Sequence, residues 1–320
     1  MLKKYFSKEN ICWIIFAAVI FTLITFLMNV GVIGSYYQIT LYNICINVIL
    51  AVSLNLIIGV CGQFSLGHAG FMCIGVYSAA IVVRSMSNLL GFALGVGIGI
   101  VISTIAALIV SIPTLRLRGD YLAIATLGFS EIIRIIVLNL KITNGAAGLS
   151  GIAKLTTWPL LFVLMVASIV IVTNFSRSRQ GRACISIRED EIASEAMGIN
   201  TTRYKTTAFV IGAALASVAG ALYACNFYVI KPDLFTFNKS IDILVMVVFG
   251  GMGSMTDSVI AAAFIGVLNM LLQNFSSIRM VIYGVVLVAI MIFRPGGLLG
   301  TKEFTFSALL HRKRKEKGRK

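Results

Sequence analysis

Long apolar runs, each about the length of a membrane span, follow one another along this chain of 320 residues. A helix that crosses the hydrocarbon core of a bilayer needs about 20 apolar residues. Hydrophobic residues make up 58% of the chain and charged residues only 12%, which is about half the charged fraction of an ordinary soluble domain. The sequence therefore predicts an all-α fold, a polytopic transmembrane helix bundle.

The apolar runs predict about ten spans, with a range of eight to ten. Three runs, at 68–84, 240–255 and 258–274, are short enough to form re-entrant or broken helices instead of full spans. The remaining runs cover residues 11–33, 39–60, 88–112, 121–140, 158–175, 207–230 and 278–293.

The distribution of positive charge predicts which side of the membrane each connection faces. Cytoplasmic connections of membrane proteins carry an excess of lysine and arginine. If the N-terminus is cytoplasmic and the spans alternate, most of the 27 lysine and arginine residues fall on the cytoplasmic side. We therefore expect both termini in the cytoplasm, and a basic cytoplasmic tail at 301–320 that lies on anionic lipids rather than on nucleic acid.

The sequence lacks the residues that several kinds of chemistry require. None of the six cysteines forms a CxxC pair, and the chain has two histidines, so we expect no metal and no cofactor. The sequence also has no Gly-Lys dipeptide, and so it lacks the P-loop that cradles phosphate groups. We expect that the chain is not an enzyme, and that any ATP hydrolysis that drives it occurs on another polypeptide.

Glycine and polar residues interrupt the apolar pattern over residues 55–75. The polar side chains there are Asn55, Gln63, Ser65 and His68. Irregular backbone is not tolerated against lipid, so this stretch must be buried in protein, line water or lie at the interface. It is either a pore-lining or gate element, or a tight cytoplasmic turn between two spans. For His68 we favour a hydrogen-bonded structural role over proton transfer.

A second glycine-containing stretch echoes the first. Gly59-x-x-Gly62 followed by Gly75-Val76 recurs as Gly250-x-x-Gly253 followed by Gly266-Val267. Broken helices at matching positions often line a transport path. Because so few residues are identical between the two stretches, chance explains the echo as well as duplication does.

Small residues also recur every four positions at Gly91, Gly95 and Gly99, and at Gly212, Ala216, Gly220 and Ala224. Such stripes favour close helix packing in lipid.

Glu131 and Arg134 are charged residues placed inside a predicted span. Their spacing of three residues puts them on one helix face, where they can pair. Charge at membrane depth is costly, so both side chains should face the bundle. They either line the path of a zwitterion or form a structural ion pair that locks two helices, and we favour the second.

A long polar segment, residues 177–206, separates two apolar runs in the middle of the chain. Its residues from Arg188 to Met197 have helix-forming composition, and Gly198 stands where a left-handed helix cap is expected. Ile192 and Met197 offer apolar anchors among the charges. The segment is either a rigid peg that contacts a soluble partner or a solvated helical loop.

Several blocks of sequence resemble one known family. They are SLNLIIGVCGQFSLGHAGFMCIGVYSAA at 53–80, LRLRGDYLAIATLGFSEIIRI at 115–135, GRACISIREDEIASEAMGINTTRYKTTAF at 181–209, FGGMGS at 249–254 and RPGGLLG at 294–300. In this order they are similar to LivM-type permease subunits of branched-chain amino acid ABC importers. Urea-importer permeases of the same superfamily are close relatives.

The resemblance implies a permease domain over residues 1–300, in the plasma membrane, with a cytoplasmic coupling loop at 177–206. Glu195-Ala196 with Gly198 resembles the EAA-type loop, whose short helix sits in a groove of the ATPase subunit in that family. The residues expected to couple to the ATPase are Arg188, Glu189, Asp190, Glu191, Glu195, Ala196 and Gly198. The residues expected at a translocation path or gate are Asn55, Gln63, Ser65, His68, Glu131 and Arg134.

The same resemblance implies partners and a substrate. The partners are a second, LivH-type permease, two ATP-binding subunits and an extracytoplasmic substrate-binding protein. The implied activity is import of leucine, isoleucine and valine; the alternatives are a permease for urea, amides or other amino acids, and a self-contained secondary transporter. A secondary transporter predicts several carboxylates inside the membrane, whereas only Glu131 lies deep in a predicted span.

Overall fold

The computed structural model describes residues 8–31, 33–114 and 119–271, together with the four positions 281, 284, 285 and 288. The chain divides into two compact units, Met1–Gln38 with Lys302–Lys320, and Ile39–Thr301. The first unit contains the apolar helix α1 (Lys8–Asn29). The expected basic tail and the RPGGLLG motif lie outside the described residues, as does most of the expected span at 278–293.

The second unit is built of helices with two very short strands. Its helices are α2 (Ser35–Asn55, which begins just before the unit), α3 (His68–Ser85), α4 (Leu89–Thr114), α5 (Asp120–Asn139), α6 (Trp158–Arg177), α7 (Arg179–Glu189), α8 (Glu191–Ala196), α9 (Thr201–Ala224), α10 (Phe237–Gly250) and α11 (Met255–Leu271). The shorter elements are the π-helical turn η2 (Leu56–Val60), the 3-10 turns η3 (Gly145–Ala147) and η4 (Pro232–Phe235), and the strands β1 (Leu149–Ser150) and β2 (Val229–Ile230).

Six helices in the described part of the chain are long and apolar enough to cross a membrane. They are Ser35–Val60, His68–Ser85, Leu89–Pro113, Asp120–Asn139, Trp158–Arg177 and Thr201–Ala224. Two further apolar helices, Ile15–Asn29 and Met255–Leu271, are shorter. The expected all-α, polytopic bundle is confirmed, while the number of eight to ten spans and the cytoplasmic termini stay predictions.

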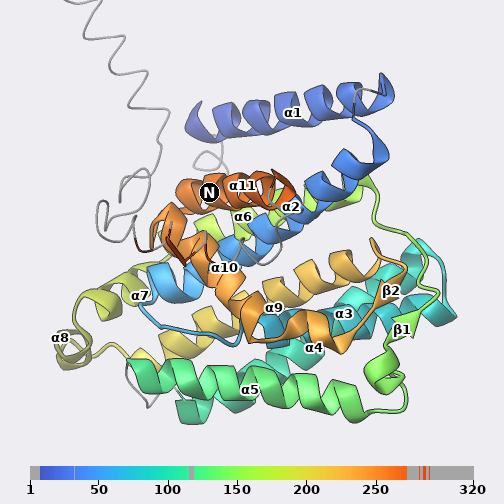
Figure 1. The fold of residues 1–320 in the computed structure, drawn as a ribbon. Coiled ribbons are helices and arrows are strands. Elements are labelled where there is room, and N and C mark those ends of the chain that lie inside the picture. The colour runs from blue at the N-terminus through green and yellow to red at the C-terminus, as the bar shows by residue number, and fades with distance from the viewer. Residues whose placement is uncertain are drawn as a thin grey trace, which may run out of the picture. The chain divides into compact units, whose positions relative to one another are not determined.

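Helices α3, α4 and α9 pack against one another at the centre of the second unit, where small residues bring them close together (Figure 1). A Cβ atom on Gly220 of α9 would lie 2.1 Å from the carbonyl oxygen of Met72 in α3, and one on Gly95 of α4 would lie 2.8 Å from the Cα of Ala79. Contacts this short exclude any larger residue, so both predicted stripes of small residues lie at helix crossings. Tight backbone contact of this kind holds helices together in lipid, where burial alone cannot.

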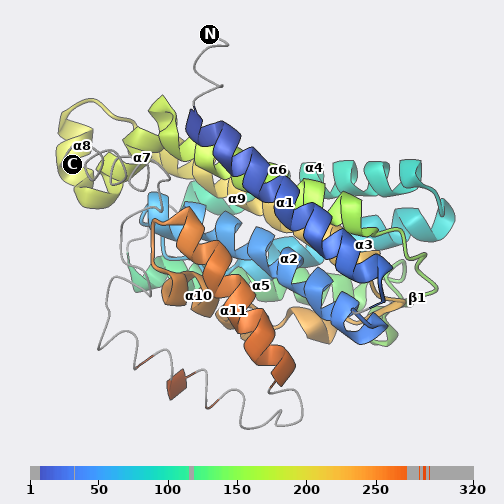
Figure 2. The same ribbon diagram turned by 90° about the horizontal axis from the view of Figure 1, so that it is seen from above.

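The two ends of the second unit carry different structures. Helices α7 and α8 lie at one end of the bundle, and the two-stranded sheet lies at the opposite end, in both ribbon views (Figures 1 and 2). Strand β1 pairs with β2 in antiparallel orientation, with Leu149 opposite Ile230. The helices that connect these ends expose isoleucine, leucine and valine on their outer faces, most of all α4, α5 and α6. Apolar outer faces of this length match the hydrocarbon core of a bilayer.

Candidate functional site

The first break, residues 56–67, interrupts the backbone between α2 and α3. Helix α2 widens into the π-helical turn η2, after which residues 62–67 run without regular structure to the start of α3. Gly62 has a φ of +70°, which glycine adopts at little cost. The four polar side chains expected here are all buried: Asn55, Gln63, Ser65 and His68. These four side chains are therefore buried within the protein, while Gly62 and Phe64 of the same stretch are exposed.

Asn55 joins the first break to the second break, which is the turn at residues 251–254 between α10 and α11. Its Oδ1 accepts a hydrogen bond from the backbone N–H of Gly253 at 2.9 Å. Its Nδ2 donates to the carbonyl oxygen of Ser254 at 2.8 Å and to Oγ of Ser258 at 2.9 Å. The side chain is fully buried, so these bonds form away from water, where unpaired partners would be costly. The two stretches that echo each other in sequence are therefore in contact.

The other polar residues of the first break differ in how well they are paired. His68 Nε2 and Ser53 Oγ lie 2.7 Å apart in a buried hydrogen bond, which is the kind of contact that a structural role for His68 requires. Ser65 Oγ accepts from the backbone N–H of Gly67 at 3.4 Å. The amide nitrogen and oxygen of Gln63 have no hydrogen-bond partner among the described residues, although the side chain is buried. Gln63 is thus a polar group that this conformation leaves unpaired.

Glu131 and Arg134 form the expected ion pair on α5. Arg134 Nε lies 2.7 Å from Glu131 Oε2, and the arginine and glutamate side chains are 20% and 31% exposed. Arg134 Nη1 also lies 4.0 Å from Oδ1 of Asp233 in η4. The pair belongs to a single helix, so it does not by itself lock two helices; Asp233 supplies the link to a second element. Its partial exposure places the pair on the side of the bundle rather than in its core.

This geometry predicts non-additive effects of substitution. Glu131→Gln leaves Arg134 without its close partner, and Arg134→Met leaves a lone carboxylate, whereas the double variant removes both charges. We expect each single substitution to cost about 1–2 kcal/mol, below the figure for a fully buried pair because solvent screens these side chains. The double variant should cost less than the sum. Unfolding of the purified protein in detergent measures this, and additive costs would contradict the pairing.

The polar segment folds as two helices rather than one. We expected one helix from Arg188 to Met197, and this expectation is wrong: α7 ends at Glu189 and α8 begins at Glu191. Asp190 between them is extended, and its Oδ1 accepts from the backbone N–H of Ala193 at 3.0 Å. An aspartate side chain that caps a helix start competes with continuation of the preceding helix. The chain therefore turns at this point and forms a helical hairpin.

The predicted cap at Gly198 is confirmed. Gly198 has a φ of +82°, and a Cβ atom there would meet nothing within 4 Å. A larger residue would therefore be strained by backbone conformation alone. The following N–H, of Ile199, donates to the carbonyl oxygen of Ser194 at 3.0 Å. This closes α8 and directs the chain into α9.

Most charged side chains of the polar segment pair within it. Glu191 Oε1 lies 2.6 Å from Nζ of Lys205 in α9, and Glu195 Oε1 accepts from Oγ1 of Thr201 at 2.7 Å. The hydroxyl groups of Ser186 and Ser194, on α7 and α8, lie 2.8 Å apart. Glu191 and Glu195 therefore tie α8 to the start of α9, and the expectation that these charges contact an ATPase stays a prediction.

Two apolar side chains on α8 and just after it point into solvent instead. Ile192 is 70% exposed and Met197 is 82% exposed. Ala196 is exposed as well, four residues after Ile192 and so on the same face of α8. Glu189 and Asp190 add exposed acidic groups at the hairpin turn. An apolar patch on an otherwise polar hairpin is typical of a surface that another protein covers.

Arg188 points the opposite way, into the bundle. Its Nη1 donates to the carbonyl oxygen of Gly59 at 2.5 Å, so α7 touches the first break directly. One turn earlier on α7, the buried Sγ of Cys184 donates to the carbonyl oxygen of Tyr204 at 3.7 Å. Interaction with the thiol of Cys61 lowers the pKa of Cys184, and the same interaction raises the pKa of Cys61 well above its usual value. Sequence reasoning did not predict either contact.

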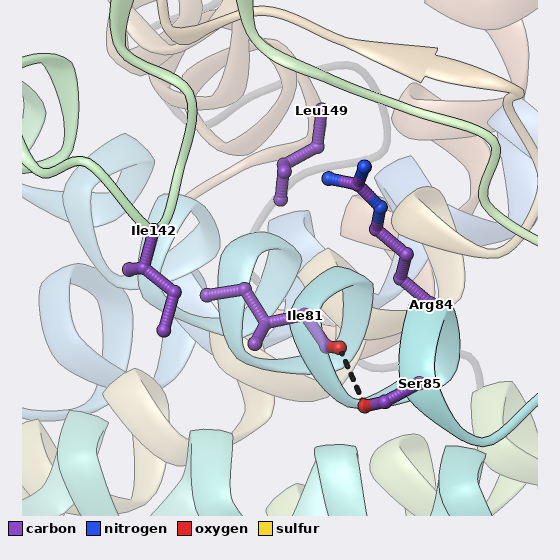
Figure 3. Close-up of a pocket in the computed structure, with 5 residues that line it drawn as sticks. All are labelled: Ile81, Arg84, Ser85, Ile142 and Leu149. Atoms are coloured by element: carbon purple, nitrogen blue, oxygen red, sulfur yellow. Dashed lines mark hydrogen bonds between the residues drawn. The ribbon is translucent and has the colours of Figure 1, made fainter.

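A shallow pocket of about 330 Å³ lies toward the sheet end of the bundle. In Figure 3 the side chain of Arg84 extends from α3 toward Leu149, and Ser85 Oγ donates to the carbonyl oxygen of Ile81 at 3.2 Å. Ile142 completes the lining. None of the predicted site residues lies in this pocket. The part of the chain that the structure describes also contains no group of three or more potential metal ligands.

Comparisons with known proteins give a consistent result. The family model described as "Branched-chain amino acid transport system / permease component" matches residues 36–293. The LivM proteins of Salmonella typhimurium and Escherichia coli, each named a high-affinity branched-chain amino acid transport system permease protein, are 37% identical over 289 residues, covering 79% of this chain and 68% of theirs. The corresponding LivH protein of Salmonella typhimurium is 33% identical over 148 residues, covering 46% of this chain and 47% of its own. The comparison with solved structures gives no match.

Proposed function

This chain belongs to the family of branched-chain amino acid transport system permeases, and we propose that it is the membrane-spanning subunit of an ATP-driven importer. The proposed cargo is leucine, isoleucine and valine, carried into the cytoplasm. The observation that carries this proposal is the family match over residues 36–293, a range that contains both breaks and the whole polar segment. The relatives are named as permeases of branched-chain amino acids.

The energy source of the proposed importer lies on other polypeptides. Without a Gly-Lys dipeptide, the 320 residues have no P-loop to hold ATP phosphates. We propose two ATP-binding subunits in the complex, with one of them bound at the exposed face of α8. A LivH-like permease completes the membrane part, supported by the pairing of LivM and LivH names among the relatives. An extracytoplasmic binding protein delivers the amino acid.

The proposed orientation puts both termini and the polar segment in the cytoplasm, with the sheet end of the bundle facing outward. The support is the concentration of positive charge in the polar segment, which carries Arg177, Arg179, Arg182, Arg203 and Lys205. The proposed location is the plasma membrane, and the proposed role of the tail at 301–320 is to bind anionic lipids.

Two groups of residues remain candidates for the path or its gate. Asn55, Gln63, Ser65 and His68 are buried at the first break, which favours a gate element over an open pore lining. The unpaired amide of Gln63 suits a residue that gains partners in another conformation. Glu131 and Arg134 lie on the side of the bundle, where a second permease subunit rather than lipid is the favourable neighbour for charge.

Transport by the reconstituted complex tests this function. The chain is assembled with its partner subunits in proteoliposomes, with ATP on the side of the ATPase and loaded binding protein on the other. We expect ATP-dependent uptake of radiolabelled leucine, isoleucine and valine, and no uptake when the P-loop lysine of the ATPase is replaced. Uptake of urea without leucine would identify the urea-importer alternative. Leucine uptake without ATP would identify a secondary transporter.

A further inference from the structure

The guanidinium group of Arg188 lies where the end of α7 meets both breaks. Nη1 donates to the carbonyl oxygen of Gly59 in the first break at 2.5 Å. On its other side, Nε and Nη2 donate to Oε1 of Glu189 at 3.2 Å and 2.6 Å. The side chain is 35% exposed, so most of its surface is covered. The planar fork of an arginine fixes both sets of contacts in one orientation.

A glycine from each break makes room for this side chain. A Cβ atom on Gly62 would lie 2.7 Å from Cγ of Arg188, and one on Gly253 would lie 3.0 Å from its Nη1. Both glycines also have positive φ, +70° and +100°. The breaks touch each other at the same place, because a Cβ atom on Gly59 would lie 2.3 Å from the backbone nitrogen of Gly253. Arg188 therefore occupies a space that a side chain at Gly62 or Gly253 would narrow.

The contact with Gly59 has a favourable electrostatic basis. In the last turn of η2, the carbonyl oxygens of Leu56, Ile57 and Ile58 accept from the backbone N–H groups of Cys61, Gln63 and Gly62. The next carbonyl oxygen, that of Gly59, accepts from Arg188. Carbonyl groups at a helix end lack partners within the helix and carry partial negative charge. A cation from α7 supplies both the missing donor and the complementary charge.

The elements on either side of Arg188 are tied internally. The ion pair between Glu191 and Lys205 and the hydrogen bond between Ser186 and Ser194 hold α7, α8 and the start of α9 together. On the other side, Asn55 ties α2 to the second break. A displacement of the hairpin therefore displaces Arg188, and Arg188 contacts two breaks that are already linked to each other.

We propose that Arg188 is the positioning residue through which movement of the α7–α8 hairpin reaches both breaks at once. It acts through its hydrogen bond to Gly59 and its close packing against Gly253, and it does not bind the ATPase. This inference rests on the proposed function, because it needs an ATPase that moves the hairpin. It differs from the expectation drawn from the sequence, in which the charge of Arg188 faces the ATPase.

The test compares Arg188→Met with Arg182→Met in the complete complex. Arg182 is an exposed arginine of α7 whose Nη1 donates to the carbonyl oxygen of Arg177 within the polar segment. Arg182→Met therefore removes the same charge from the same helix as Arg188→Met does. For Arg188→Met we expect the ATPase to co-purify and to hydrolyse ATP, while uptake falls about tenfold or more, so that more ATP is consumed per solute. Arg188→Lys should restore part of the uptake. Arg182→Met should transport at the wild-type level.

Three outcomes would overturn the proposal: loss of the ATPase from the Arg188→Met complex, an equal loss of uptake in Arg182→Met, or unchanged uptake in Arg188→Met. A second measurement covers the case in which Arg188→Met does not fold. Two copper(II) ions of copper phenanthroline, each taking one electron, oxidise the buried thiols of Cys61 in the first break and Cys184 in α7 to a disulfide, and two protons pass to water. This bond would fix α7 against the first break in the wild-type chain.

We expect the oxidised complex to stop uptake with its ATPase still bound, and dithiothreitol to restore uptake. A Cys61→Ser variant should be insensitive to the oxidant. Full uptake by the crosslinked complex would overturn the proposal. Absence of any ATP-driven uptake by the untreated wild-type complex would instead count against the proposed function, so the two failures are distinguishable.

Discussion

Replacement of Asn55 with leucine is expected to abolish uptake and to destabilise the bundle. Leucine has the same number and branching of side-chain heavy atoms but offers no polar atom, so the buried N–H of Gly253 loses its acceptor and Ser254 and Ser258 lose a donor. An orphaned buried group of this kind costs about 1–3 kcal/mol. The functional loss should be larger than the loss of folded protein, because the second break would no longer move together with α2. Uptake per folded complex, together with the unfolding midpoint in detergent, measures the two effects.

Asn226 offers a matched control for this substitution. It is also a buried asparagine, but its Nδ2 and Oδ1 have no hydrogen-bond partner among the residues that the structure describes. Asn226→Leu therefore removes no observed bond, and we expect folded yield and uptake close to those of the wild-type chain. If Asn55→Leu and Asn226→Leu behave alike, the link between the two breaks has no functional role.

The double substitution Ile192→Asp with Met197→Asp is expected to release the ATPase subunit. Both side chains are largely exposed in this chain alone, so the variant should fold and insert normally. In the complex they would be buried, and placing carboxylates in an apolar contact costs about 2 kcal/mol or more at each important position. Binding of the ATPase should therefore weaken by about a hundredfold or more. The dissociation constant for the ATPase subunit, measured on the purified permease pair, tests this.

A control at the opposite end separates docking from a general effect of added charge. Tyr228 and Val229 are exposed apolar residues next to and within β2. Tyr228→Asp with Val229→Asp adds the same charge and should leave binding of the ATPase unchanged. Equal weakening by both pairs of substitutions, or full binding by the Ile192/Met197 variant, would show that α8 is not the docking surface.

The sequence predicted the features that depend on local pattern. Runs of apolar residues located the helices, because a span needs a fixed length of hydrocarbon-compatible chain. The stripes at Gly95 and Gly220 and the cap at Gly198 were also predictable, since each requires glycine or another small residue for a local steric reason. The pairing of Glu131 with Arg134 follows from helical spacing alone.

The contacts that define the candidate site depend on distant parts of the chain. Arg188 and Gly59 are 129 residues apart, and Asn55 and Gly253 are 198 apart, so no local pattern shows that they meet. The repeated Gly-x-x-Gly pattern was the one available signal, and it became informative only when the structure showed both copies in contact. Asp190 was misread for a related reason: its neighbours favour a helix, and its own side chain ends that helix by capping the next one.

The central claim is that the chain presents α8 to an ATPase at one end and receives its cargo at the other. Site-specific photo-crosslinking in the assembled importer measures this directly, with a photoreactive residue at Met197 or at Tyr228. Both are largely exposed; Met197 directly follows α8 and Tyr228 directly precedes β2, and these two elements lie at opposite ends of the bundle. We predict that Met197 crosslinks to the ATP-binding subunit, and that Tyr228 crosslinks to the loaded substrate-binding protein. A crosslink from Met197 to the binding protein, or from Tyr228 to the ATP-binding subunit, would contradict the account.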